Sequence, residues 1–176
     1  MIKSATASPS SAPAAPLTAT IDDRAVTIRP GETILSAATR VGIEIPTLCH
    51  SPGLAPEGGC RICMVEIEGQ RTQAACHTPI ANGMRVRTES PHLTSLRREI
   101  LHLTISANPR GALRPRVDGT AMERLLARYG VESSDFGHHA SSRPVDASHP
   151  SMRFDRDRCI TCRACLHACE EVQGQF

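Results

Sequence analysis

Apolar and polar residues alternate at the start of the chain, in two short runs. Residues 17–22 (LTATID) and 24–29 (RAVTIR) show the period of two that is typical of half-buried strands. Asp22 and Asp23 stand between these runs and suit a tight turn. The pattern therefore predicts two strands joined by a turn.

A helical period follows the strands and then gives way to a loop. Apolar residues fall on one helical face within residues 33–41, and Gly42 stands where a C-terminal cap is expected. That face consists of Ile34, Leu35, Ala38 and Val41. A Gly- and Pro-rich loop runs to Cys63, and three strand-like stretches follow it: 64–68, 71–77 and 84–88. This order predicts an α+β domain of about eighty residues, in which a mixed sheet folds over one helix.

Beyond this domain the pattern is helical again and then irregular. Residues 93–106 carry apolar side chains at helical spacing, and residues 122–129 form a second helical pattern closed by Gly130. The first stripe consists of Leu96, Ile100, Leu103 and Ile105. Residues 133–151 are rich in Ser, His, Pro and Asp and are expected to form a linker or surface loop. A small module is expected from about Phe154.

Composition argues against several classes of protein. With 176 residues, 40% of them apolar but only 2% aromatic, the chain can form one core or two small modules that draw stability from metal or disulfides. The net charge of +2 gives no nucleic-acid-binding footprint, and no apolar run approaches the ~20 residues that span a bilayer. Residues 1–16 lack the apolar centre of a secretory signal, so a disordered tail and a cytoplasmic location are expected.

Eight cysteines carry the candidate chemistry, and four of them form a first set. Cys49, Cys60, Cys63 and Cys76 are separated by ten, two and twelve residues. Four thiolates suit a [2Fe–2S] cluster, because sulfur is a soft ligand for iron and each iron takes two protein ligands. A reducing compartment favours metal binding over disulfides.

A zinc site made of the same four thiolates is the alternative. Zinc sites usually pair two short Cys-x-x-Cys knuckles, whereas only Cys60 and Cys63 form such a pair here. A loop around a cluster also has to direct N–H groups at the sulfurs, which positive φ and missing side chains make easier. Gly53, Gly58 and Gly59 offer these properties, so the pattern favours the cluster.

The motifs around these cysteines resemble a known family. IPTLCH, GGCRICMVEIEG, AACHTPI and GMRV are similar to the N-terminal [2Fe–2S] domain of the large subunit of complex I, its G subunit. They are equally similar to the α subunit of NAD-dependent formate dehydrogenases and to the small diaphorase subunit of NAD-reducing hydrogenases. The resemblance implies a β-grasp [2Fe–2S] ferredoxin domain at residues 17–92, a helical linker at 93–152 and the start of a bacterial-type [4Fe–4S] ferredoxin module at 153–176.

A second cluster of that family is expected to be absent from this chain. The family holds it with His-x3-Cys-x2-Cys and one further Cys. The matching positions hold Asn108, Ala112, Pro115 and, near the last, Ala121. None of these can ligate iron as an imidazole or a thiolate does. The histidines nearby and in the linker are interpreted as packed or surface residues rather than ligands: His102, His138, His139 and His149.

The other four cysteines match the bacterial ferredoxin run for a [4Fe–4S] cluster: Cys159, Cys162, Cys165 and Cys169. In two-cluster ferredoxins the fourth cysteine binds the neighbouring cluster, and a second run completes the first cluster. No second run precedes Phe176, and Glu170 replaces the usual Pro. Three interpretations stay open, of which we favour the first: the chain is part of a longer subunit, Cys169 completes a single cluster, or the site is partly filled.

These patterns indicate electron transfer. No Gly-rich nucleotide fingerprint and no nucleophile–base pair is evident, so the sequence offers no catalytic residues. The resemblance implies that a [2Fe–2S] and a [4Fe–4S] cluster relay electrons between a flavin/NAD-binding diaphorase subunit and a molybdopterin or hydrogenase catalytic subunit. The stretches EEVQG and RYGV favour a formate dehydrogenase α subunit. The alternatives are a hydrogenase diaphorase small subunit, a complex I-type subunit and, from another class, a zinc-binding structural protein.

Overall fold

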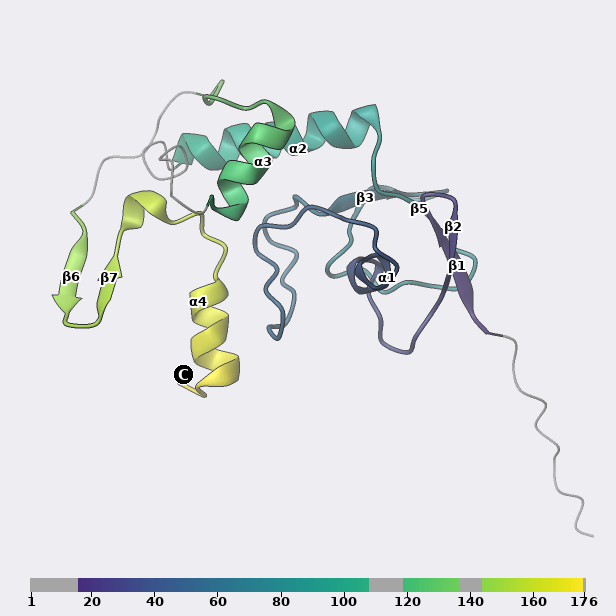
Figure 1. Cartoon of the computed structure of the whole chain (residues 1–176), viewed down its shortest axis with the longest axis horizontal. Coiled ribbons are helices and arrows are strands. Elements are labelled where there is room, and N and C mark those ends of the chain that lie inside the picture. The colour runs from purple at the N-terminus through teal and green to yellow at the C-terminus, as the bar shows by residue number, and fades with distance from the viewer. Residues whose placement is uncertain (1–15, 108–118, 137–143, 176) are drawn as a thin grey trace, which may run out of the picture.

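The computed structural model describes residues 16–107, 119–136 and 144–175. Asn108, Ala112 and Pro115 of the vacated family site lie outside these ranges, as do His138, His139 and all but the last residue of the predicted tail. Within the ranges, a sheet occupies one end of the molecule, and α2 (Pro91–Ala107) leads from it towards the C-terminal elements (Figure 1).

The sheet has five strands in the spatial order β2-β1-β5-β3-β4. Their bounds are β1 (Thr18–Ile21), β2 (Arg24–Thr27), β3 (Met64–Ile67), β4 (Gln73–Ala74) and β5 (Arg85–Arg87). Asp22 and Asp23 form the predicted turn between β1 and β2, with φ of 46° and 62°. β1 and β5 pair in parallel, whereas the β1–β2, β3–β4 and β3–β5 pairs are antiparallel. The stretch predicted as a strand at 71–77 is extended only at β4, because the chain turns at once to carry Cys76.

One helix, α1 (Ile34–Arg40), packs on this sheet and completes its core. It begins at a capping box, in which the Ser36 N–H donates to Thr33 Oγ1 at 3.2 Å and the Thr33 N–H donates to Ser36 Oγ at 2.9 Å. The helix buries Ile34, Leu35, Ala37 and Ala38, whereas Val41 is half-buried. Gly42 follows with a φ of 76°, as expected after a helix end. The predicted α+β class is confirmed.

A second core forms between α2 and α3 (Ala121–Tyr129). Leu101 and Ile105 of α2 pack with the apolar face of α3 and with Ile62 of the cysteine loop. The face predicted for α2 is wrong in part, because Leu103 is 53% exposed. The buried residues at four-residue spacing are Leu93, Arg97, Leu101 and Ile105. A charged residue interrupts this stripe, and a search for continuous apolar spacing therefore selects the neighbouring one.

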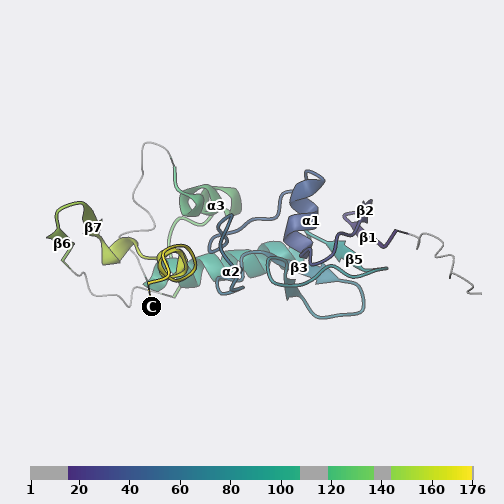
Figure 2. The same cartoon turned by 90° about the horizontal axis from the view of Figure 1, so that it is seen from below.

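The C-terminal part consists of short elements. These are β6 (Asp146–His149), β7 (Met152–Phe154), the 3₁₀ turn η1 (Arg156–Arg158), α4 (Ala164–His167) and the π-helical turn η2 (Ala168–Val172). Figure 2 shows the β6–β7 hairpin at the end opposite the sheet. The linker predicted at 133–151 is therefore wrong at its end, where every residue of β6 is exposed and no period of two marks the strand. No helix in the described ranges is long and apolar enough to cross a membrane.

Candidate iron–sulfur sites

Two loops next to β3 and β4 carry the first cysteine set. Cys63 directly precedes β3, and Cys76 follows β4 within two residues. The Ala75 N–H donates to the Cys63 carbonyl at 3.0 Å, and the Leu35 N–H of α1 donates to the Ala75 carbonyl at 2.9 Å. The hydrogen bonds of the sheet and the first turn of α1 therefore fix where these two cysteines stand.

The four thiols meet as two pairs. Cys49 and Cys60 are in hydrogen-bond contact, and so are Cys63 and Cys76. The pairs are close enough that the charge of Cys76 is felt by Cys49 and Cys60. Cys63 and Cys76 are each only 2% exposed, whereas Cys49 and Cys60 are half-buried. Two adjacent pairs are the arrangement that two irons with two cysteine ligands each require.

The ionisation of these thiols shows why a cation would suit the site. The hydrogen bond that Cys63 donates to Cys76 raises the pKa of Cys63, and burial raises it further. Accepting that bond lowers the pKa of Cys76. Burial is also the main cause that raises the pKa of Cys49. Four thiolates this close repel one another in a low dielectric, and iron would compensate that charge.

Backbone N–H groups already point at the sulfurs. The Cys60 N–H donates to the thiol of Cys49, and the Gly58 N–H donates to the thiol of Cys76. In addition, Nδ1 of His50, next to Cys49, is buried and has no partner among the described residues. A cluster with inorganic sulfides would present acceptors to such a group. The donor set and this orphaned nitrogen fit a [2Fe–2S] cluster.

The geometry argues against the zinc alternative at the first set. A tetrahedral zinc site needs three or four ligands around one point. Among residues 16–107, 119–136 and 144–175, no three His, Cys, Asp or Glu side chains converge in a way that could hold one metal ion. Paired thiols that do not share one centre suit two irons better than one zinc.

The glycines of the loop play unequal parts. Gly53 and Gly58 have the expected positive φ, of 86° and 66°, whereas Gly59 does not. A Cβ on Gly58 would lie 3.4 Å from Cβ of His77. Gly58 is therefore needed both for its backbone conformation and for the close approach of the Cys76 loop.

The second cysteine set follows η1 in one continuous segment. Cys159 and Cys162 are half-buried, whereas Cys165 and Cys169 are exposed and lie on α4 and η2. Thr161 and Arg163, on either side of Cys162, have φ of 53° and 60°. Two such residues turn their backbone inwards around Cys162, a conformation that favours N–H groups facing an anionic centre. The segment presents its four thiols from a loop and two helical turns, without a described contact between them.

The two sets face each other across a groove. Cys49 and Cys60 line one side and Cys162 lines the other, around a volume of about 480 Å³. Glu57 Oε1, from the first loop, lies 2.9 Å from Arg163 Nη1 and 3.0 Å from His167 Nε2. The Ala55 N–H donates to Glu171 Oε2 at 2.8 Å. No sequence pattern indicates these contacts, because they join residues more than a hundred positions apart.

The histidines behave as the sequence analysis expected where the structure describes them. His102, on α2, is 8% exposed, and its Nδ1 accepts from the Asp135 N–H at 3.3 Å. His149 lies on the exposed strand β6. Ala121, at the last position of the vacated family site, begins α3 and offers only a methyl group.

The fold and the paired thiols define an iron–sulfur protein of the [2Fe–2S] ferredoxin class. Residues 14–91 match the family described as the 2Fe-2S iron-sulfur cluster binding domain. A solved structure of an NAD+-reducing [NiFe]-hydrogenase in the H2-reduced state matches with a TM-score of 0.81 and 33% identity, over 92% of this chain and 69% of that one. The chain belongs to the iron–sulfur family that includes the G subunit of complex I and the NAD-reducing hydrogenase subunits.

Curated relatives agree and are much longer. The NADH-quinone oxidoreductase of Rhizobium meliloti has a relative in its G 2 subunit, which is 36% identical over 160 residues that cover 88% of this chain and 19% of the relative. The NADP-reducing hydrogenase subunit HndD of Solidesulfovibrio fructosivorans is 37% identical over 165 residues, covering 89% and 28%. The chain thus spans between a fifth and somewhat over a quarter of these relatives.

Proposed function

We propose that this chain is an electron-transfer module of an NAD(P)-linked oxidoreductase and that Cys49, Cys60, Cys63 and Cys76 hold its [2Fe–2S] cluster. The single observation that carries the proposal is the meeting of these four thiols as two pairs, with N–H groups directed at them. When bound, such a cluster accepts and gives one electron at low potential, near about −400 mV for plant-type centres.

We assign a [4Fe–4S] cluster to the second set, Cys159, Cys162, Cys165 and Cys169. Their spacing and the inward-turned backbone around Cys162 support this assignment. The groove between Cys60 and Cys162 brings the two sets next to each other, as a relay needs. Whether Cys169 ligates this cluster or a neighbouring one stays part of the proposal, as does the division at residues 17–92, 93–152 and 153–176.

The partners follow from the family. We assign a flavin/NAD-binding diaphorase subunit as one partner and a catalytic subunit with a molybdenum-type site, as in formate dehydrogenases, as the other. The stretches EEVQG and RYGV favour this assignment. The hydrogenase alternative has an observation in its favour, the structural match to an NAD+-reducing [NiFe]-hydrogenase. A complex I-type subunit is the further alternative.

Cluster content tests the proposal on the full chain purified without oxygen. We expect about six iron and about six labile sulfide per chain, and a brown colour that dithionite bleaches. Cys63→Ser should remove only the [2Fe–2S] signal from the EPR spectrum, and Cys162→Ser only the [4Fe–4S] signal. A colourless protein with about two zinc per chain contradicts the proposal. About two iron per chain contradicts only the assignment of the second set.

Metal content of the whole assembly tests the catalytic partner. The chain is tagged in its own cells, and the purified assembly is analysed for molybdenum and nickel. Molybdenum in proportion to the chain supports the formate dehydrogenase assignment. Nickel in its place contradicts that assignment and supports the hydrogenase alternative.

A further inference from the structure

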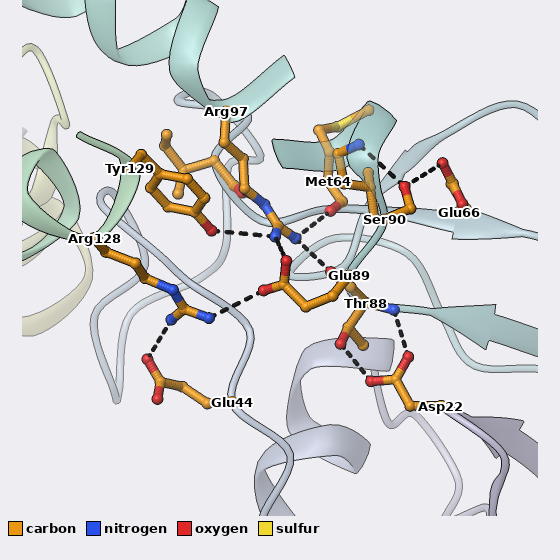
Figure 3. A network of polar contacts seen from close by, with 12 residues as sticks. Asp22, Glu44, Met64, Glu66, Thr88, Glu89, Ser90, Arg97, Arg128 and Tyr129 are labelled. Atoms are coloured by element: carbon orange, nitrogen blue, oxygen red, sulfur yellow. Dashed lines mark hydrogen bonds and ion pairs between the residues drawn. The ribbon is translucent and has the colours of Figure 1, made fainter. Parts of the chain in front are cut away.

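Arg97 of α2 is a cation with no exposed side-chain surface. Its guanidinium donates to three backbone carbonyls (Figure 3). Nε lies 3.2 Å from Ile62 O, and Nη2 lies 2.9 Å from Met64 O and 2.8 Å from Thr88 O. Burying a guanidinium is costly even when it is fully hydrogen-bonded, and an apolar side chain would fill the same space at lower cost. A role beyond packing is therefore indicated.

The bonds of Arg97 hold the backbone on both sides of Cys63. Ile62 and Met64 are the chain neighbours of Cys63, and both of their carbonyls accept from Arg97. The carbonyl of Cys63 itself accepts from the Ala75 N–H at 3.0 Å. All three consecutive carbonyls are thus fixed, and the direction in which the Cys63 thiol leaves the backbone is fixed with them.

The charges around Arg97 alternate outwards towards solvent. Arg97 Nη1 lies 3.0 Å from Glu89 Oε2, and Glu89 Oε1 lies 3.0 Å from Arg128 Nη2. Arg128 Nη1 in turn lies 2.9 Å from Glu44 Oε1. The exposed fraction of the side chain rises from 0% at Arg97 to 46% at Glu89 and 82% at Glu44. Water screens the outer charges most, so the field of Arg97 is least screened on its inner side.

That inner side faces the cysteine loop. The contacts to Ile62 and Met64 place the guanidinium against the backbone of Cys63, which is 2% exposed. Tyr129 of α3, whose hydroxyl accepts from Arg97 Nη1 at 3.2 Å, closes the site from the second core. Little water separates the cation from the thiol, and the local dielectric is correspondingly low.

We propose that Arg97 positions Cys63 and raises the reduction potential of the [2Fe–2S] centre, an inference that rests on the function proposed above. One added electron makes a four-thiolate cluster more negative by one charge. A nearby buried cation therefore stabilises the reduced form more than the oxidised form. Arg97 acts on the cluster through Cys63 and through its field, without being a ligand.

The test is the reduction potential of the full chain, titrated with dithionite and mediator dyes under argon and followed by the EPR signal of the reduced [2Fe–2S] centre. Arg97→Gln should lower the equilibrium constant for reduction about tenfold, which is about 59 mV for a one-electron couple. Arg97→Lys keeps the charge and should recover part of this loss. Arg98→Gln, the same change at the exposed next residue, should leave the potential unchanged.

Glu89→Gln supplies an opposite sign and leaves the three carbonyl bonds of Arg97 in place. It removes the countercharge and should make the centre easier to reduce. The proposal is overturned if Arg97→Gln retains its iron and the wild-type potential, or if Glu89→Gln fails to raise the potential. If Arg97→Gln loses its iron, Glu89→Gln alone decides. In these cases the wild-type cluster still stands, whereas a wild-type chain without iron overturns both proposals.

Discussion

Arg163, the residue after Cys162, lies 2.9 Å from the carboxylate of Glu57 in the first cysteine loop. His167 binds the same carboxylate oxygen from the other side, at 3.0 Å, and its Nδ1 lies 2.8 Å from Glu171. These two carboxylates raise the pKa of His167. One acidic side chain in the first loop therefore anchors two cationic groups of the second cysteine segment.

Glu57→Gln should loosen the second cysteine segment without unfolding the sheet. The amide removes the charge from both ion pairs, which solvent screens in part, so the effect is modest. We expect backbone amides of residues 159–172 to exchange hydrogen about two to five times faster, as measured by mass spectrometry. Glu68→Gln is the matched control, because Glu68 pairs with Arg85 on the exposed surface. Equal exchange in both variants would refute the anchoring role of Glu57.

Gly58→Ala should impair the first cluster site, whereas Gly59→Ala should not. Gly58 has a φ of 66°, and an added Cβ would lie 3.4 Å from His77 and strain the loop that holds Cys76. The conformational cost alone is about 1–2 kcal/mol. Iron retained per chain and the visible spectrum after gel filtration measure the outcome. Full iron content in Gly58→Ala would show that the loop tolerates a side chain there.

Thr120→Ala should destabilise the second core. Thr120 Oγ1 accepts from the Glu123 N–H at 3.2 Å, and Glu123 Oε2 accepts from the Thr120 N–H at 2.5 Å. Loss of such a cap costs about 0.5–2 kcal/mol of unfolding free energy. Urea denaturation followed by circular dichroism gives the value, and Thr120→Ser, which keeps the hydroxyl, should stay close to wild type. Equal losses in both variants would argue against the cap as the cause.

The ion pair of Glu32 and Arg40 should make stability depend on pH in the acidic range. Hydrogen bonds from Arg40 lower the pKa of Glu32 below its ordinary value of 4.5. The unfolded chain then binds more protons, so the contribution of the pair is present above about pH 4.5 and disappears as pH falls through the lowered pKa. Urea midpoints of wild type and Glu32→Gln should therefore differ at pH 7 and converge in acid. A gap that widens in acid would contradict the sign.

Local patterns were sufficient to predict much of the first domain. The turn at Asp22 and Asp23, the helix closed before Gly42 and the helix closed by Gly130 each depend on residues close in sequence, and all three are confirmed. The cysteine spacing by itself likewise indicated the first site. Such features can be predicted because their causes are local: φ preference, capping and ligand chemistry.

The features that sequence patterns did not predict are non-local or break the pattern. Arg97 sits in the buried stripe of α2, and only the carbonyls of Ile62, Met64 and Thr88, brought to it by the fold, explain why a charge belongs there. A stripe of Leu, Arg, Leu and Ile at four-residue spacing could have been the signal. The β6–β7 hairpin escaped because its strands bury no side chain and so carry no alternation.

The parallel pairing of β1 with β5 joins Thr20 to Arg85 at the centre of the sheet. All four cysteines of the first set lie between these two positions along the chain. A nascent chain released only as far as Cys76 already contains every ligand but lacks the strand that locks their loops in place. Closing so long a loop is slow compared with forming local helices. We therefore expect iron–sulfur delivery to this domain to follow its synthesis, and a cell short of assembly factors to accumulate folded protein with empty thiols.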